Sequence, residues 1–376
     1  MISRHRWIAV AAVASTLATA ARADWPLFRG DARLTGMASG VLPEHPEPLW
    51  TFQADEGIES TAALAGGLVY VGSLGGSLYA LESKTGKVKW TYRTGDEIKS
   101  SPSVHGGTVY FGDEGGAFHA LDARSGEERW TIQVDAGVIS SANFAGRCVL
   151  FGSQDNSLYC VAPRTGRRLW SLETGSYIYS TPSVVDLDGE VVALITGCDG
   201  LLRVVRVADG TQIRAVDMGA YVGASPAVSG GRAFVGTFDN QVLGIDLEAG
   251  RVAWTFEDPD RPFPFYSSAA VGEKAVVVGG RDKRLHALDR ASGRSLWTFS
   301  AGGRIDGSPV ILGRRVFFGA LDGRLYALDL SSGEKLWQFD TGSALVASPS
   351  IAAGHLVIGT RDGVLYCFGK RQEQHG

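Results

Sequence analysis

The chain repeats one arrangement of apolar and polar positions about every 40 residues. Each copy has a segment that alternates around a tryptophan, as in VKWTYRTG (88–95), and then a Ser/Pro-rich segment, as in SSPSV (100–104). An apolar run that ends in glycine follows, as in TVYFGD (108–113), and then a sequence such as LYALD and a Thr-Gly or Ser-Gly turn. Alternation and short apolar runs indicate strands, and no run keeps a helical period. Four short strands per copy predict the blade of a β-propeller.

The spacing of the tryptophans gives the number of copies. Forty residues separate Trp50 from Trp90, and the same interval recurs along the chain. A serine or threonine follows most of these tryptophans after eleven residues, and counting back from Ser225 places Arg214 in the slot of a missing tryptophan. The chain therefore has eight copies, and Arg214→Trp is expected to raise the melting temperature. The predicted blade anchors, which should pack between neighbouring blades, are Trp50, Trp90, Trp130, Trp170, Trp254, Trp297 and Trp337.

The two ends of the repeat predict how the ring closes. The first tryptophan segment, PLWTFQ (48–53), has no blade before it, and the last fourth strand, near Leu365, has no tryptophan segment after it. Joining them completes the last blade and removes exposed sheet edges. We predict an all-β, eight-bladed propeller of four-stranded antiparallel blades. It forms a single domain over residues 24–370, with a polar tail at 371–376.

The repeats resemble the PQQ-like β-propeller family. LYALDLSSGEKLW (325–337), LYALESKTGKVKW (78–90) and FHALDARSGEERW (118–130) carry the resemblance, and DWPLFRGDARLTG (24–36) resembles the lead-in of secreted members. The family includes quinoprotein dehydrogenases and the propeller of the outer-membrane β-barrel assembly machinery. The resemblance covers residues 24–370 and implies the fold more strongly than the function, because function depends on the site that each member carries.

The first residues indicate export. A basic start at Arg4–Arg6, an apolar stretch from Trp7 to Ala20 and ARA at 21–23 are typical of a signal peptide over residues 1–23. The stretch is shorter than the ~20 residues of a membrane span, although an anchor is the alternative. We expect a periplasmic or otherwise exported, soluble monomer without a transmembrane segment. A net charge of -4 argues against nucleic acid as a partner.

Four cysteines remain, and none forms a C-x-x-C pair. Cys160 and Cys367 align with small residues such as Ala80 and are expected to pack as small buried groups. Cys148 and Cys160 share a hairpin, about two residues out of register, so no disulfide is expected between them.

Two functions follow from the resemblance. The first is a non-catalytic scaffold that binds protein or peptide partners in the cell envelope. The alternative is a PQQ-binding oxidoreductase or quinone sensor, which the family implies would need a tryptophan floor, a vicinal disulfide and calcium ligands. The chain has no adjacent cysteines, and its mature tryptophans serve as blade anchors except Trp25. No catalytic residues, metal or cofactor are therefore expected, and PQQ with calcium belongs to the alternative. A carbohydrate- or peptide-binding channel is a third possibility.

Two groups of residues are candidate sites. The position before each Ser/Pro segment should rim the central channel, with Glu59, Lys99, Tyr179, Tyr266 and Asp306 as its polar and aromatic members and Ile139, Gly223 and Val346 completing it. The alternative is a weakly selective, water-filled channel. The sixth copy has three extra residues in EDPDRPFPFYSS (257–268). Its Pro262, Phe263, Phe265 and Tyr266 are a candidate interface loop, unless the rings cap the blade's own core.

Overall fold

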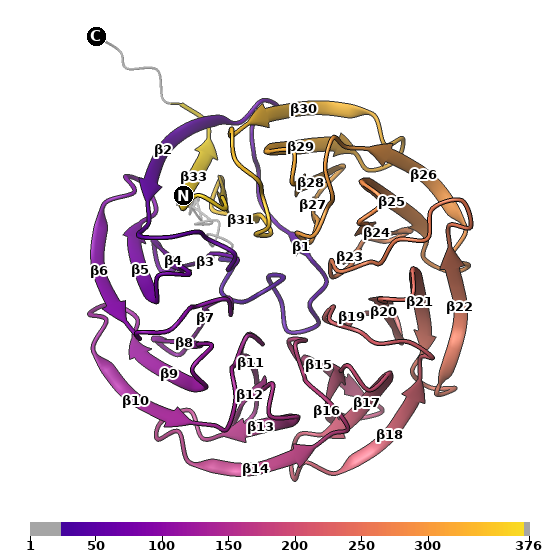
Figure 1. Cartoon of the computed structure of the whole chain (residues 1–376), viewed down its shortest axis with the longest axis horizontal. Coiled ribbons are helices and arrows are strands. Elements are labelled where there is room, and N and C mark those ends of the chain that lie inside the picture. Colours follow the sequence, from indigo (N-terminus) through magenta and orange to yellow (C-terminus); the bar gives the residue numbers. More distant parts are fainter. Residues whose placement is uncertain (1–23, 372–376) are drawn as a thin grey trace, which may run out of the picture.

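A computed structural model describes residues 24–371 as a ring of eight small sheets (Figure 1). The predicted signal peptide and all of the polar tail but Arg371 lie outside the described residues. The described part is all-β, and within it no helix is long and apolar enough to cross a membrane. The predicted eight-bladed propeller is confirmed.

Each blade is a four-stranded antiparallel sheet that runs outward from the centre of the ring. Blades 1 to 4 consist of β3 (Ala63–Ala65), β4 (Leu68–Gly72), β5 (Ser77–Glu82) and β6 (Val88–Arg93); β7 (Ser103–His105), β8 (Thr108–Gly112), β9 (Ala117–Asp122) and β10 (Glu128–Gln133); β11 (Asn143–Ala145), β12 (Cys148–Gly152), β13 (Ser157–Val161) and β14 (Arg168–Glu173); and β15 (Ser183–Leu187), β16 (Glu190–Thr196), β17 (Leu201–Arg206) and β18 (Gln212–Asp217).

The second half of the ring repeats this order. Blades 5 to 8 consist of β19 (Ala227–Ser229), β20 (Arg232–Gly236), β21 (Gln241–Asp246) and β22 (Arg251–Glu257); β23 (Ala270–Val271), β24 (Ala275–Gly279), β25 (Arg284–Asp289) and β26 (Ser295–Ser300); β27 (Val310–Leu312), β28 (Arg315–Gly319), β29 (Arg324–Asp329) and β30 (Lys335–Asp340); and β31 (Ser350–Ala352), β32 (His355–Gly359) and β33 (Val364–Gly369) with β2 (Glu47–Gln53). β2 pairs with β33, so the N-terminal strand closes the ring as predicted. A short β1 (Met37–Ala38) adds to β27.

The Ser/Pro segments form a hydroxyl belt around the axis. In seven successive pairs of blades, the backbone N–H of one belt residue donates to the hydroxyl of the next at 2.8 to 3.1 Å. The belt consists of Thr61, Ser101, Ser141, Thr181, Ser225, Ser268, Ser308 and Ser348. The residue that marks the repeat in the sequence is therefore the residue that links the blades at the centre.

The tryptophans link the blades at the periphery. Six of the seven anchors donate an indole N–H to a carbonyl of the following blade at 2.9 to 3.2 Å; for Trp90 the acceptor is Ala123. The ring lies on the glycine of that blade's turn, as Trp90 does on Gly126, where a Cβ would come 2.6 Å from the indole. Of the seven anchors only Trp130 and Trp254 are buried, each with 8% of its surface exposed. The other rings keep an exposed edge, so the contact stabilises less than full burial of each ring would.

Arg214 occupies the eighth anchor slot. Its guanidinium donates to the carbonyls of Leu247 and Glu248 in the next blade, and Gly250 lies against its side chain. The strand partner differs from that of the other anchors, because Arg214 pairs with Val204 where Trp90 pairs with Ala80 and Trp254 with Gly244. A tryptophan in this slot would therefore meet a larger neighbour than any other anchor does.

This neighbour refines the expectation for Arg214→Trp. We expect the single substitution to gain little, because overpacking against Val204 offsets the added burial. The double variant Arg214→Trp/Val204→Ala should melt at a higher temperature than Val204→Ala alone. Thermal unfolding of the wild type and the three variants tests this, and a double variant no more stable than Val204→Ala would contradict the placement of the slot.

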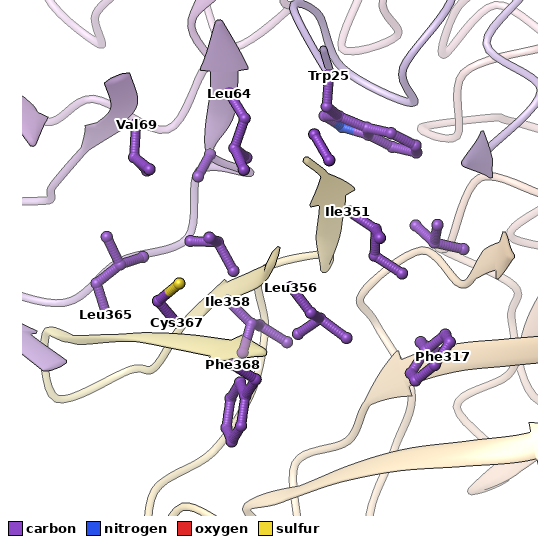
Figure 2. Close-up of a cluster of buried hydrophobic side chains, with 14 of the residues drawn as sticks. Trp25, Leu64, Val69, Phe317, Ile351, Leu356, Ile358, Leu365, Cys367 and Phe368 are labelled. Carbon is purple, nitrogen blue, oxygen red and sulfur yellow. The ribbon is translucent and has the colours of Figure 1, made fainter. Parts of the chain in front are cut away.

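The lead-in, residues 24–38, crosses the centre of the ring between the innermost strands (Figure 1). Its backbone carbonyls accept from the innermost strands of blades 2, 4, 5, 6 and 7 in turn, and Trp25 exchanges two hydrogen bonds with Leu64 of blade 1. The Asn143 side chain of blade 3 donates to the Ala32 carbonyl at 2.8 Å. The Trp25 indole is 2% exposed and packs near Leu64 and Ile351 of blades 1 and 8 (Figure 2). The lead-in therefore closes one face of the predicted channel.

The expectation about Cys148 and Cys160 is wrong. The two cysteines form a disulfide inside blade 3, with Cα atoms 5.1 Å apart. Leu150 lies directly opposite Cys160. Cys148 comes two residues before Leu150, so it is the diagonal neighbour of Cys160 on the same face of the sheet. Diagonal pairs lie within reach in a twisted sheet, and the Cα separation falls within the usual range for a disulfide. Cys198 and Cys367 are free, and Cys367 faces Trp50 in the small slot predicted for it.

Thiol counting tests this pairing. Burial raises the pKa of Cys367 to about 12, and it also raises the pKa of the half-buried Cys198. The native protein should therefore react slowly with a thiol reagent at pH 8. The unfolded, unreduced protein should show two thiols, and the reduced protein four. Four thiols before reduction in protein recovered from an oxidising compartment would contradict the disulfide. Its loss should lower the free energy of unfolding by about 2–3 kcal/mol.

Candidate functional site

The eight predicted rim positions lie at corresponding places around one end of the ring. Each comes two residues before a belt residue, and all eight are partly buried between buried neighbours. The lead-in contacts the innermost strands three residues after the belt, as at Val228 after Ser225. A strand advances ~3.3 Å per residue, so the rim and the lead-in occupy opposite ends of the ring. We call the end that carries the rim positions the rim face.

A second set of positions, which the sequence analysis missed, also lines the rim face. The residue two places after each strand-closing glycine, or one place after it in blade 4, begins the turn between the second and third strands. Its backbone N–H donates, at 2.9 to 3.1 Å, to a carbonyl of the segment that enters the same blade from the preceding one. These turn positions are Leu74, Glu114, Gln154, Cys198, Phe238, Arg281, Leu321 and Arg361. In most blades they follow the rim residue by 15 positions, a spacing from which they could have been found.

Aromatic residues gather on the rim face of blades 4 to 6. Tyr177 and Tyr179 lie 5.9 Å apart between ring centroids, and Phe238 and Tyr266 lie 4.6 Å apart. Gly223 lies between the two pairs, since a Cβ at this position would come 2.9 Å from Phe238 and 4.0 Å from Tyr179.

Tyr221 comes from the same segment as Gly223, and its carbonyl accepts from the Phe238 N–H at 2.9 Å. Tyr221 is 61% exposed and Tyr177 is 48% exposed. The aromatic arc, defined as Tyr177, Tyr179, Tyr221, Phe238 and Tyr266, thus presents rings to solvent on a frame of backbone hydrogen bonds.

An arginine borders the arc at blade 6. The Arg281 guanidinium lies 3.6 Å from the centroid of the Tyr266 ring. Its Nε and Nη2 donate to the two carboxylate oxygens of Asp306, both at 2.9 Å. The bidentate pair fixes the guanidinium on the ring, an arrangement that combines an ion pair with a cation–π contact. The structure therefore brings together the predicted residues Tyr266 and Asp306 through Arg281.

A polar cluster borders the arc on the other side. Lys99 Nζ lies 2.8 Å from carboxylate oxygens of both Glu97 and Glu114, and Gln154 donates to Glu114 at 3.0 Å. Burial opposes the charge of Lys99, but the two carboxylates together raise its pKa above the ordinary value. Burial raises the pKa of Tyr179, and the charges of Cys198 and Glu114 add to this shift. The fifth predicted rim residue, Glu59, lies in blade 1 and is not part of the arc.

The candidate interface loop is only partly exposed. Phe265 is 2% exposed and packs in the core between blades 5 and 6, where a Cβ on Gly236 would come 2.6 Å from it. The prediction that Phe265 is an interface residue is therefore wrong. Phe265 caps the core of its blade, as Ile98 and Ile305 do in theirs. Phe263 is 47% exposed, and Pro262 is also exposed. Tyr266, the remaining residue of the loop, is partly exposed and belongs to the aromatic arc.

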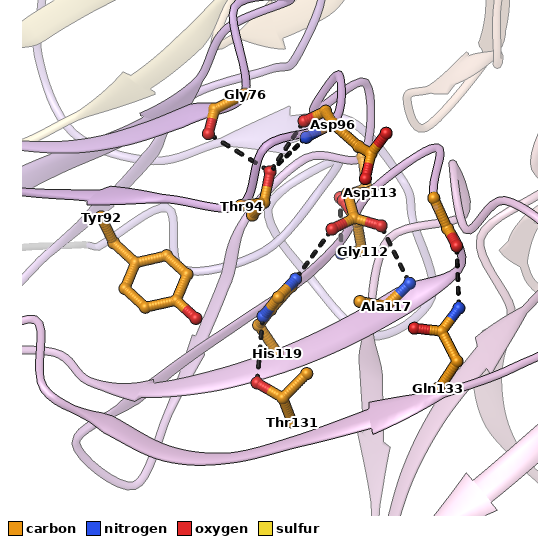
Figure 3. Close-up of polar contacts among 12 residues, drawn as sticks. Gly76, Tyr92, Thr94, Asp96, Gly112, Asp113, Ala117, His119, Thr131 and Gln133 are labelled. Carbon is orange, nitrogen blue, oxygen red and sulfur yellow. Dashed lines mark hydrogen bonds and ion pairs between the residues drawn. The ribbon is translucent and has the colours of Figure 1, made fainter.

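Other polar clusters are structural. His119 Nε2 lies 2.9 Å from Asp113 Oδ2, and its Nδ1 lies 3.1 Å from Thr131 Oγ1 (Figure 3). Both His119 and Asp113 are buried, so this group cannot meet a substrate. The same turn-to-strand contact recurs in other blades, where the partners are Asp155 with Tyr159, Asp199 with Arg203, Asp282 with His286 and Asp322 with Tyr326. Residues 186–190, DLDGE, form the turn of the β15–β16 hairpin. Among the described residues, no three His, Cys, Asp or Glu side chains are grouped to hold a metal.

Comparison with known structures identifies the fold class. BamB from Moraxella catarrhalis superposes with a TM-score of 0.72 at 20% identity, covering 86% of this chain and 100% of that one. The quinohemoprotein alcohol dehydrogenase from Comamonas testosteroni gives a TM-score of 0.80 at 14% identity, covering 96% of this chain and 83% of that one. A europium-containing methanol dehydrogenase gives 0.76 at 12% identity, covering 93% and 98%. At these identities the likeness shows the fold alone, an eight-bladed β-propeller, and not the activity.

The sequence itself assigns the family. Residues 39–197 and 264–370, more than half of the chain, match the family described as outer membrane protein assembly factor BamB. The chain belongs to this family. A search of curated protein sequences found no match. Tyr221 and Phe238 of the aromatic arc lie between the two matched segments.

Proposed function

We propose that the protein is a non-catalytic scaffold of the cell envelope, and that the rim face of blades 4 to 6 binds a protein partner. The family assignment carries the proposal. The aromatic arc supports it, because exposed tyrosines beside a fixed arginine are the residue types that contribute most to protein interfaces. Tyr221 and Tyr177 offer large apolar surfaces, and Arg281 offers a charge already held in place by Asp306.

Export to the periplasm is part of this proposal. The predicted signal peptide supports it. The disulfide between Cys148 and Cys160 adds a second argument, since disulfides persist in oxidising compartments such as the periplasm. Association with outer-membrane assembly rests on the family alone.

A quinone-dependent oxidoreductase is the second candidate, since quinohemoprotein dehydrogenases share the fold. The residues of the rim face do not fit PQQ with calcium as the family resemblance describes that site. The arc offers tyrosine and phenylalanine rings instead of a tryptophan, and the disulfide is buried in blade 3 between cysteines twelve residues apart. Trp25 belongs to the lead-in and is buried in the core against blades 1 and 8.

A thermal titration separates the two candidates. The mature protein is heated with PQQ, with and without Ca²⁺, and its melting temperature is followed. A ligand that binds the native state at a hundredfold excess over Kd adds about 2.7 kcal/mol of stability. We expect no shift at millimolar PQQ. A calcium-dependent rise would overturn the scaffold proposal in favour of a quinoprotein.

A further inference from the structure

One fully buried charge lies at the centre of the ring. Arg29 belongs to the lead-in and is 1% exposed. Its backbone has a φ of 64°, and the chain turns back so that Gly36 N–H donates to the Arg29 carbonyl at 3.1 Å. A Cβ on Gly36 would overlap the guanidinium. The turn therefore holds the guanidinium inside the ring, between blades 6 and 7.

Only part of this guanidinium has a protein partner. Nη2 donates to the carbonyls of Ala269 at 3.1 Å and Pro309 at 2.6 Å. Nε and Nη1 are buried and have no hydrogen-bond partner among the described residues. The Asp31 carboxylate accepts from Thr35 and from the Arg33 N–H, and it forms no ion pair with Arg29 within residues 24–371. The charge thus has no direct counter-ion in the described protein.

Such a charge is costly to bury. Burial lowers the pKa of Arg29 to about 9, although the nearby Asp31 opposes the shift. The group still carries its proton at neutral pH. A buried cation without a partner destabilises a protein by several kcal/mol, because it has lost its water without gaining an opposite charge. The arrangement is therefore incomplete without a further polar group.

The hydroxyl belt lies at the same level. Ala269 and Pro309 directly follow Ser268 and Ser308 of the belt. Each of these hydroxyls accepts an N–H from the preceding blade, at 3.0 and 2.9 Å. A serine hydroxyl also carries a proton that it can donate. The belt hydroxyls thus come one residue before the carbonyls that hold Nη2, in the same part of the ring as the unpartnered Nε and Nη1. Buried N–H and O–H donors gathered in one place are suited to an anion.

We propose that the centre of the ring binds a small monovalent anion such as chloride, held by Nε and Nη1 of Arg29 and by hydroxyls of the belt. One buried positive charge requires one negative charge. The enclosed position excludes a large ligand, because Arg29, Ser268 and Ser308 are all buried. The anion would connect the lead-in to blades 6 and 7, so chloride would stabilise the closed face of the ring. This site is separate from the proposed partner-binding rim face.

Chloride titration tests the site. Chloride replaces gluconate at constant ionic strength, and the melting temperature is recorded for the wild type, Arg29→Met and Arg314→Met. Arg314 is the matched control, because its side chain is 89% exposed. For the wild type and Arg314→Met, each tenfold increase in chloride above Kd should raise the melting temperature by roughly 2 °C. Arg29→Met should show no such dependence. A wild type that is indifferent to chloride, or an Arg29→Met variant that keeps the dependence, would refute the proposal.

A second measurement covers the case in which Arg29→Met does not fold. Crystals of the wild-type protein are grown or soaked in bromide, and anomalous scattering locates the ion. The proposal expects a bromide peak within hydrogen-bond distance of Arg29 Nε or Nη1. An ordered water at that position, with no anomalous signal, would contradict it.

Discussion

Trp254→Ala is expected to lower the free energy of unfolding by about 3–5 kcal/mol, the range for removing a buried tryptophan. The Trp254 ring is buried, its indole N–H donates to the Arg290 carbonyl at 3.2 Å, and Gly293 of blade 6 lies against its face. The substitution therefore removes packing and a hydrogen bond between blades 5 and 6 together. Chemical denaturation, with the slope against denaturant checked for two-state behaviour, measures the loss.

Arg214→Ala is the matched control for this prediction. Arg214 fills the same slot between blades 4 and 5, but it is partly exposed and contributes mainly its contacts to the Leu247 and Glu248 carbonyls. We expect a loss of about 1–2 kcal/mol there. If the two substitutions cost the same, the anchors do not stabilise the ring through burial of the indole.

Deleting residues 24–36 is expected to leave the ring closed but much less stable. β2 still completes blade 8, because the deletion ends before Glu47. Loss of the buried Trp25 alone should cost about 3–5 kcal/mol. The innermost strands of blades 2, 4, 5, 6 and 7 would also lose the backbone acceptors that the lead-in supplies.

Hydrogen exchange gives this prediction a specific signature. The amides of Val184, Val228, Val271 and Ile311 donate to the lead-in, and they should exchange much faster in the deletion variant. Amides in the middle strands of the same blades, such as β16 and β20, should remain protected. Uniformly faster exchange would mean that the ring itself opens, and unchanged exchange at the four amides would contradict the path of the lead-in.

The repeat made most of the fold predictable. A spacing of 40 residues between tryptophans and belt residues fixed the number of blades, because each copy must form the same two contacts with its neighbours. Arg214 could be placed from the belt residue alone. Ring closure by β2 followed from the unpaired ends of the repeat.

The features that do not repeat were harder to predict. The lead-in occurs once, so no second copy indicates that its carbonyls would meet each blade in turn. The Cys148–Cys160 disulfide depends on a diagonal contact across a twisted sheet, which counting residues along a hairpin does not show. Phe265 was assigned to the candidate interface loop because the sixth copy is longer. The three inserted residues precede it, however, and it keeps the core position of Ile305.

The candidate site was predicted in part. The rim positions were found because they precede the belt. In the structure, Tyr179 packs near Tyr177, Tyr266 packs near Phe238, and Asp306 accepts from Arg281. Phe238 and Arg281 were missed, since they come from turns whose residues differ from blade to blade. Only the backbone hydrogen bonds between turn and rim segment show that these two sets share a surface.

The central claim is that the aromatic arc contacts a protein in the cell envelope, and photocrosslinking in intact cells tests it most directly. A photoreactive phenylalanine analogue replaces Tyr221 in the arc, or Val191 as a control. Both side chains are exposed, and Val191 lies in the β15–β16 hairpin, beside its turn and away from the rim face. We predict a discrete protein adduct from position 221 that is absent from position 191 and weakened by Tyr266→Ala. No adduct from position 221, or the same adducts from both positions, would contradict the account.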